Sequence, residues 1–373
     1  MINFSRSNTG LLARWWRILD KQIFFCIIIL LFFGLLVSFS STSLIVSERL
    51  EQQSYYFFIK HFIFVIIGLC CLFSFSILKQ KQLYDLSRIF FFIFFSLLIL
   101  VPFFGIEVKG SKRWIDIFFL PRLQPIELLK PFLIVVISLA LTFGEYKSKY
   151  LNYFFSLFII FPVVLFLVIQ PDIGQSILIL LTWLILIFIS GINLIIFFSF
   201  FFIFVGSTSY LIFFIPKFEY IKNRIFSFLD PSSGNNYQSE KASEAIIGGG
   251  FFGKGVGEGT LNNRIPEAHT DYIVSVISEE FGIVIVFVII LIFIFFAFQV
   301  IKKISLENDN KIKLILMGSI SLLILQTFVH IGVNIRILPT TGMTLPFLSY
   351  GGSSIVSNAI LSGIILNLTR RKV

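Results

Sequence analysis

The sequence predicts an all-α integral membrane protein with about ten transmembrane helices and one large extracytoplasmic loop between helices 7 and 8. Two observations predict this class. Of the 373 residues, 57% are hydrophobic and only 13% are charged, whereas roughly a quarter of the residues in a soluble domain are charged. Apolar segments of about 20 residues, the length that crosses a bilayer core, also recur along the whole chain.

Ten apolar segments are long enough, or nearly so, to cross the membrane. The first is too long for the core of a signal peptide, so we expect it to be retained as a helix. The segments around 127–144 and 174–191 are short and need tilt or burial by neighbouring helices. The ten expected spans are 23–46, 57–77, 87–105, 127–144, 151–169, 174–191, 193–216, 273–300, 312–335 and 347–369.

The net charge of +10 does not indicate a nucleic-acid partner here. The basic residues cluster at the ends of apolar segments, where they fix topology and meet anionic lipid. If the two termini share one side of the membrane, that side holds sixteen of the thirty Lys and Arg residues. Six of the other fourteen lie in the long segment 217–272, where charge has little influence on orientation. We therefore expect both termini in the cytoplasm.

This topology makes residues 1–373 a single polytopic membrane domain. It has a cytoplasmic tail at 1–22, an external loop at 106–126 and a large external loop at 217–272, which holds most of the polar and glycine-rich sequence. Loops on a rigid helical frame commonly carry function. We therefore expect the chemistry on the side away from the cytoplasm.

The first external loop combines cations with an aromatic residue. Lys112 and Arg113 precede Trp114, and Lys130 follows Glu127 by three positions at the start of the fourth segment. Lys and Arg can hold phosphate oxygens by charge-assisted hydrogen bonds, and a spacing of three brings Glu127 and Lys130 together on a helix. The alternative is an interfacial basic loop with a Trp anchor and a routine ion pair.

A tight external turn carries Asp172, in the string QPDIGQS. An unpaired carboxylate at the membrane edge is costly, so Asp172 could pair with a basic residue of the first loop. A solvated turn aspartate is the alternative.

The large loop opens with an amphipathic stretch and continues into a glycine run. Residues 217–229 mix apolar and basic residues and suit a helix lying in the membrane interface. Residues 248–254 nearly match a phosphate-binding loop, but Gly255 replaces the required Ser or Thr, which excludes nucleotide binding. The glycines then form either backbone nests for an anion or flexible turns.

The densest titratable cluster precedes the eighth segment. Glu267, His269 and Asp271 fall within five residues, and Glu267 and Asp271 share a face if the segment is helical. A partly desolvated carboxylate is a candidate general base, because burial raises its pKa towards the working pH. Asp271 could equally cap the eighth helix, and the two roles are compatible.

Two acidic residues, Glu279 and Glu280, are expected about two turns into the eighth helix. Intramembrane carboxylates are functional candidates by default and need partners, for which His330 and Arg336 are the candidates. A purely structural buried pair is the alternative. The following segment, 334–354, contains two prolines that forbid a continuous helix, so we expect it to serve mainly as architecture.

Taken together, six strings in order resemble the SEDS family (shape, elongation, division and sporulation proteins). The strings are GSKRWI, QPIELLK, QPDIGQS, YQ followed by the glycine-rich stretch, PEAHTDYIVSVISEEFG and NIRILPTTGMTLPFLSYGGSS. The resemblance spans about residues 20 to 370. PEAHTD and NIRILPTTGMTLPF are most similar to the division members (FtsW) and next to the elongation members (RodA). One departure is Ile126, where the family usually has a small residue.

The resemblance implies a bacterial peptidoglycan glycosyltransferase that polymerises lipid II into glycan strands during cell division. It implies that Asp271 is the general base of an inverting transfer that releases undecaprenyl diphosphate. The expected diphosphate-binding cations are Lys112, Arg113 and Lys130, and the expected supporting residues are Glu127, Asp172, Glu267 and His269.

The resemblance also implies a setting for this activity. We expect the bacterial cytoplasmic membrane at the division septum, with a class B penicillin-binding protein and other division proteins as partners. No cofactor is certain, and a divalent cation at the diphosphate stays open. The alternatives are an elongation-type polymerase, a lipid II flippase or transporter, and a scaffold that only positions a transpeptidase. We see no internal repeat of the kind that transporters often have, and the polar clusters favour an enzyme acting at one face.

Overall fold

The computed structural model describes residues 10–41, 56–108, 111–116, 122–144, 149–230, 237–261 and 268–371. Within these ranges the chain is mostly helical, which confirms the predicted class of an all-α membrane protein. The helices are α1 (Leu11–Ile18), α2 (Lys21–Ser41), α4 (Tyr56–Ile77), α5 (Gln80–Phe104), α6 (Pro125–Leu141), α7 (Lys149–Ile169), α8 (Ile173–Ile189), α9 (Leu194–Phe214), α10 (Glu219–Leu229), α11 (Tyr237–Gly249), α13 (Ala268–Asp271), α14 (Ile273–Phe281), α15 (Ile283–Leu306), α16 (Asn310–Asn334) and α17 (Gly352–Thr369).

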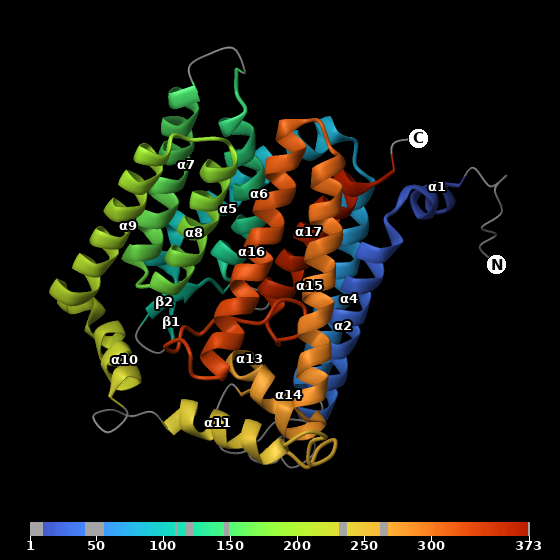
Figure 1. The fold of residues 1–373 in the computed structure, drawn as a ribbon, viewed down its shortest axis with the longest axis vertical. Helices are drawn as coiled ribbons and strands as arrows, with labels where there is room; N and C mark the ends of the chain where they lie inside the picture. Colours follow the sequence, from blue (N-terminus) through green and yellow to red (C-terminus); the bar gives the residue numbers. More distant parts are fainter. Residues whose placement is uncertain are drawn as a thin grey trace.

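Eight of the described helices are long and apolar enough to cross a membrane, namely α2, α4, α5, α7, α9, α15, α16 and α17. The two segments expected to be short, α6 and α8, have 17 residues each. They lie inside the bundle (Figure 1), and most side chains of α6 are buried. Their burial by neighbouring helices fits the expectation from their length.

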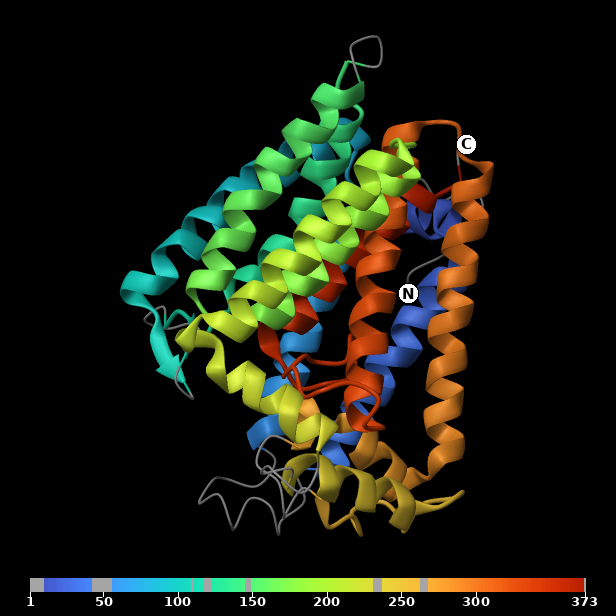
Figure 2. The same cartoon turned by 60° about the vertical axis from the view of Figure 1, so that its left-hand side comes forward.

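The long helices run side by side along the long axis of the molecule (Figure 1). Viewed from a second side, α15 stands at one edge of the bundle and the tilted α5, α7 and α9 form the other (Figure 2). The α1 helix and the last described residues meet at one end, where Arg371 N–H donates to Ile18 O at 2.8 Å. The first and last described residues therefore lie at the same end of the bundle, as the charge pattern predicts. That this end faces the cytoplasm stays a prediction.

The opposite end of the bundle, here called the site end, collects most of the short elements. They are the strands β1 (Ile106–Val108) and β2 (Ser111–Trp114), the 3-10 helix η1 (Pro216–Phe218), the helices α10, α11, α13 and α14, and the irregular segment 335–351 (Figure 1). The antiparallel β1–β2 hairpin was not predicted, because three- and four-residue strands leave little pattern in a sequence. The expected interfacial stretch 217–229 is indeed helical, as η1 and α10.

The most buried of these eight helices is α17, in which 89% of the residues are buried inside the protein. It packs chiefly on α4, and glycines on both helices permit the close approach. A Cβ on Gly68 of α4 would lie 3.1 Å from Ala359 Cβ, and a Cβ on Gly363 of α17 would lie 2.7 Å from Leu72 O. Asn367 Nδ2 of α17 also donates to Leu78 O, just after the end of α4, at 2.7 Å.

The expected eighth span, 273–300, is wrong as a single helix. The chain breaks at Gly282, whose φ of +85° separates α14 from the apolar span α15. A side chain at Gly282 would also meet Phe251 O at 2.2 Å, so only glycine fits this position. The hydropathy of 273–281 hid the break, because α14 is almost fully buried against protein, where an apolar helix is also expected. The expected third span, 87–105, is longer than predicted and begins at Gln80, and the tenth, 347–369, begins only at Gly352.

The close approach of α4 and α17 generates a testable expectation. Gly363→Leu should lower the free energy of unfolding by about 1–3 kcal/mol, because the added side chain meets the backbone of α4. Gly206→Leu on α9 is the matched control, since nothing lies within 4 Å of its would-be Cβ. Thermal unfolding of both variants in detergent checks this. Equal stability of the two would show that α17 does not need the glycine.

Candidate active site

The short helix α13, which ends at Asp271, is anchored by the irregular segment that follows α16. The last carbonyl groups of a helix lack partners within the helix. In α13, three consecutive carbonyls receive them from outside. The bonds run from Tyr350 N to His269 O at 3.2 Å, from Ser349 Oγ to Thr270 O at 2.8 Å and from Asn334 Nδ2 to Asp271 O at 3.2 Å. The backbone of Asp271 is thereby fixed to the bundle, and segment 334–354 is the architecture that the sequence predicts.

The side chain of Asp271 is half-buried beside this same segment. Its Oδ2 would lie 3.7 Å from a Cβ at Gly342. Burial raises the pKa of the neighbouring Tyr272 phenol to about 12, and the Asp271 charge adds to the rise. The N-cap of α14 is Tyr272 and makes no side-chain cap bond, so the alternative in which Asp271 caps that helix is wrong. A carboxylate on a fixed backbone at the site end is suited to accept a proton.

His269 lies in an aromatic cluster with Phe57 and Tyr350. Its ring is 5.0 Å from Phe57 and 5.6 Å from Tyr350, centroid to centroid, and His61 of α4 is 6.0 Å from Tyr350. The cluster joins α13 to α4 and to the start of α17. Glu267, the other predicted supporting residue, lies outside the described residues.

Glu127 and Lys130 form a buried ion pair in α6, which confirms the proximity predicted from their spacing. Lys130 Nζ lies 2.8 Å from Glu127 Oε1 and also donates to Gln175 and Gln326 at 3.4 and 3.2 Å. Gln175 Nε2 in turn donates to Glu127 Oε1 at 2.7 Å. Three partners thus use the donors of the ammonium group.

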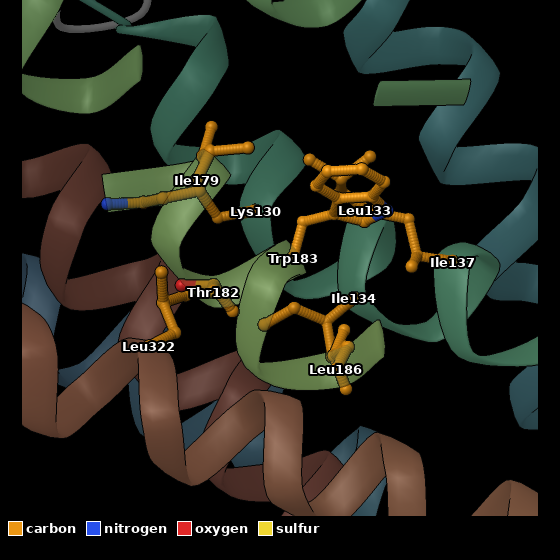
Figure 3. Close-up of a pocket in the computed structure, with 9 residues that line it drawn as sticks. All are labelled: Lys130, Leu133, Ile134, Ile137, Ile179, Thr182, Trp183, Leu186 and Leu322. Carbon is orange, nitrogen blue, oxygen red and sulfur yellow. The ribbon is translucent and has the colours of Figure 1, made fainter. Parts of the chain in front are cut away.

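No space of substrate size reaches Lys130 within the part of the chain that the structure describes. The Lys130 side chain is 1% exposed. The gap beside it, drawn in Figure 3 with Leu133, Ile179 and Trp183, measures only about 10 Å³. That is about the room of one water molecule. A direct contact between Lys130 and a diphosphate stays a prediction, and in this conformation Lys130 instead neutralises and orients Glu127.

The buried pair is connected to the segment that anchors Asp271. Gln326 Nε2 donates to Thr344 O at 2.9 Å, and Thr344 Oγ1 lies 2.8 Å from Ser354 Oγ. His330, on the same helix as Gln326, bonds Met343 O through Nδ1 at 2.7 Å. One irregular segment therefore contacts α13 on one side and the Glu127–Lys130 network on the other.

Asp172 pairs with Arg113 of the first loop, as predicted, with 3.6 Å between Oδ1 and Nη1. Gln124 Nε2 donates to its other oxygen at 3.3 Å. Burial raises the pKa of the Asp172 carboxyl, and the Arg113 guanidinium opposes that rise. Arg113 also donates to Pro171 O, which accepts from Tyr220 OH at 2.6 Å as well. Of the three predicted cations, the exposed Lys112 on β2 is the most open to a ligand.

The candidate partners His330 and Arg336 are wrong, because Glu279 pairs with Lys254 and Glu280 accepts from Ser40. Because the chain breaks at Gly282, both glutamates lie in α14 at the site end. Glu279 bonds Lys254 Nζ at 2.7 Å and Leu261 N at 2.9 Å. Burial raises the pKa of the Glu279 carboxyl, but the hydrogen bonds from Lys254, Thr260 and Leu261 together leave it below its ordinary value.

The glycine run forms turns, one of the two roles considered from the sequence, and an anion nest stays a prediction. The run docks backbone to backbone on the end of α14. Lys254 N donates to Glu279 O at 2.8 Å, and Ile283 N donates to Gly250 O at 3.0 Å. A Cβ on Gly253 would lie 2.2 Å from Glu280 O, so a side chain would prevent this approach.

A large cavity at the site end was missed by the sequence reasoning. It measures about 650 Å³ and lies between α10, the start of α11 and segment 333–340. Arg224 and Arg336 line it. The signal available in the sequence was the basic stretch of α10, which was interpreted only as a membrane-interface helix. Across the described ranges, no three His, Cys, Asp or Glu side chains gather as a metal site, and a divalent cation at this end stays an untested prediction.

Comparisons with known proteins show the family and the fold. The family described as cell cycle protein (FtsW/RodA/SpoVE) matches residues 20–373. The chain is 34% identical over 297 residues to the probable peptidoglycan glycosyltransferase FtsW of Caulobacter vibrioides, covering 77% of this chain and 74% of that protein.

Two solved structures share the fold. One, described as structural coordination of polymerization and crosslinking by a peptidoglycan synthase complex, has a TM-score of 0.73 at 22% identity and covers 94% of this chain and 97% of that one. The rod shape determining protein RodA of Thermus thermophilus has a TM-score of 0.69 at 22% identity, with 95% and 97% covered. At this identity the likeness concerns the fold alone.

Removing one partner of the buried pair should be costly. Lys130→Met leaves Glu127 as an uncompensated buried charge, so we expect a loss of about 3–5 kcal/mol of unfolding free energy. Adding Glu127→Gln should recover most of that loss, because the buried charge disappears. Arg88→Met, in an exposed pair with Asp85 at 3.1 Å, is the control and should change little. Denaturation in detergent measures all three; a double variant no better than Lys130→Met would contradict this account.

The contacts of Glu279 with Lys254, Thr260 and Leu261 should be sensitive to acid. A carboxyl whose pKa is lower in the folded state than in the unfolded state stabilises the fold at pH values above its ordinary pKa. This stabilisation is lost as the pH falls through the pKa of the folded state. Glu279→Gln should therefore cost about 2 kcal/mol at neutral pH, and its gap to wild type should narrow below pH 4.5, the ordinary value. Unfolding temperatures across pH check this, with the exposed Glu244→Gln as control. A gap that widens in acid would refute it.

Proposed function

The chain belongs to the FtsW/RodA/SpoVE family of cell cycle proteins, and from that premise we propose that it is a peptidoglycan glycosyltransferase that polymerises lipid II during cell division. The relative from Caulobacter vibrioides bears the name of that activity. The observation that carries the catalytic assignment is the anchoring of α13, which fixes the Asp271 backbone through Asn334 and its neighbours beside Gly342.

Asp271 is the general base in this proposal. Its carboxylate takes the proton of the 4-hydroxyl on the acceptor sugar of one lipid II. That oxygen then attacks the anomeric carbon of the growing strand, and the bond to undecaprenyl diphosphate breaks on the opposite face. The configuration at the anomeric carbon inverts, and the leaving group carries away the electron pair as an anion.

The other predicted residues take supporting roles. Lys112 and Arg113 would stabilise the departing anion, and Asp172 would orient Arg113, with which it is paired. Glu127 and Lys130 are enclosed in the bundle. We propose that this pair acts by holding Gln326, and with it segment 335–351, in place.

His269 would support the base by fixing α13 through the aromatic cluster with Tyr350. Glu267 is proposed as a second acidic group beside the base, on sequence grounds alone. A divalent cation at the diphosphate is compatible with this scheme and is not required by it.

The setting follows from the same family membership. We propose the cytoplasmic membrane at the division septum, with both termini inside, so that the site end faces lipid II on the outer side. The solved structure with a TM-score of 0.73 is described as a peptidoglycan synthase complex that coordinates polymerization and crosslinking. A class B penicillin-binding protein is accordingly the proposed partner here, with other division proteins.

Polymerisation by purified protein tests the proposal. Asp271→Asn should retain the fold but lose at least ~10²-fold in rate, the usual contribution of a general base. Asp85→Asn at the exposed start of α5 is the control for a carboxylate-to-amide change. Glycan strands from lipid II, with the transpeptidase present, are the measured product.

Two outcomes would overturn this function. Full activity of Asp271→Asn would remove the base. If wild type forms no strands but moves labelled lipid II across liposome membranes, the chain is a flippase.

A further inference from the structure

The cavity at the site end is strongly cationic. Its lining residues include Arg224 and Arg336 and the polar residues Asn223, Gln238 and Thr340. Among the described lining residues there is no Asp or Glu. A hollow of about 650 Å³ with two cations and several neutral hydrogen-bonding groups is suited to an anion.

This charge is available in a way that two of the three predicted cations, Lys130 and Arg113, are not. Lys130 is buried and paired with Glu127, and the half-buried Arg113 is paired with the buried Asp172. In the described part of the chain, the Arg336 side chain makes neither a hydrogen bond nor an ion pair with protein. Among the described residues, its positive charge therefore has no acidic partner beside the cavity.

The backbone at Arg336 carries a second, independent signal. α16 ends in a Schellman motif, in which Arg336 N donates to Val333 O at 3.2 Å and Ile337 N to Gly332 O at 2.8 Å. The left-handed position of this motif is ordinarily glycine, but here Arg336 holds it with φ of +59°. A strained non-glycine residue that persists beside a cavity points to a function of its side chain.

Arg224 reaches the cavity from α10 in a fixed orientation. Its guanidinium lies 5.5 Å from the Tyr220 ring centre, and Nη1 donates to Thr340 O at 3.3 Å. These contacts use one of five donors and leave the others for a ligand. The positive charge also acts on Tyr272, the residue after Asp271, where it opposes the rise in the phenol pKa. The cationic cavity thus lies within electrostatic reach of the proposed base.

We propose that Arg224 and Arg336 bind the diphosphate of the lipid-linked substrate, an inference that rests on the proposed function. A diphosphate offers several oxygens and more than one negative charge to two guanidinium groups, each of which can bind bidentately. A carboxylate of the substrate peptide offers two oxygens and a single charge. The same cations would stabilise the charge that develops as the diphosphate departs.

Binding, rather than turnover, provides the test, so its result does not depend on whether the chain polymerises lipid II. The full-length Asp271→Asn protein in detergent is titrated with undecaprenyl diphosphate, alone and with Arg224→Gln, Arg336→Gln or Arg336→Gly added. Each substitution should raise the dissociation constant ~10-fold or more, as expected when a charge-assisted hydrogen-bonding group is lost. Lys222→Gln, also on α10 but outside the cavity lining, removes the same charge and should change binding less than ~3-fold.

Arg336→Gly separates folding from binding. Glycine suits the left-handed position, so the unfolding temperature of this variant should equal or exceed that of its parent while its binding is weakened. A variant that unfolds early and loses binding only in proportion to unfolded protein would overturn the role given to Arg336.

Two competitors distinguish the sources of the anion. A soluble disaccharide-peptide carries the substrate's carboxylates without the diphosphate, and phosphatidylglycerol carries a headgroup phosphate. Neither should displace undecaprenyl diphosphate at equal concentration. Displacement by the disaccharide-peptide would assign the cavity to the peptide, and displacement by phosphatidylglycerol would make it a general lipid-headgroup site. Unchanged binding in all the arginine variants would remove the site altogether.

Discussion

The backbone between α16 and α17 is not helical, and every polar group that it brings to the edge of the bundle needs a partner. Unsatisfied backbone groups are costly where water is scarce, so irregular segments persist there only when protein supplies the bonds. Residues 335–351 meet much of this demand through bonds with α13, α16 and α17. Thr344 bonds to Gln326 and Ser354, and Ser349 and Tyr350 bond to α13. The bonds that satisfy this segment are therefore the ones that place Asp271.

Some basic side chains of this chain are paired with carboxylates, and others have no acidic partner among the described residues and can bind an anion. Taking an isolated cation out of water is expensive, and a carboxylate partner reduces that penalty. The buried Lys130 and the half-buried Arg113 are held in this way and become parts of the frame. Arg224 and Arg336 remain in a polar cavity without an acidic partner in its described lining. The position of the acidic residues, more than that of the basic ones, decides where an anion can bind.

Much of the fold followed from local patterns. Hydrophobicity and length located the apolar helices, and the need of α6 and α8 for neighbours followed from their shortness. The spacing of Glu127 and Lys130 was enough to predict their pairing, because three residues make one helical turn. The break at Gly282 was not visible, because glycine in an apolar run is equally consistent with a continuous helix. It became a requirement only when Phe251 and Gly253 packed against it.

The sequence by itself determined the membrane class, the order of the helices, the irregular segment after α16 and the residue types at one end of the bundle. Tertiary structure decided which of those residues meet. Arg113 reaches Asp172 and Glu279 reaches Lys254 only because distant segments dock on one another, and Arg336 lacks an acidic partner for the same reason. Hydropathy and spacing are properties of neighbouring residues along the chain. Charge pairing depends on contacts between segments far apart in sequence, and no local pattern records them.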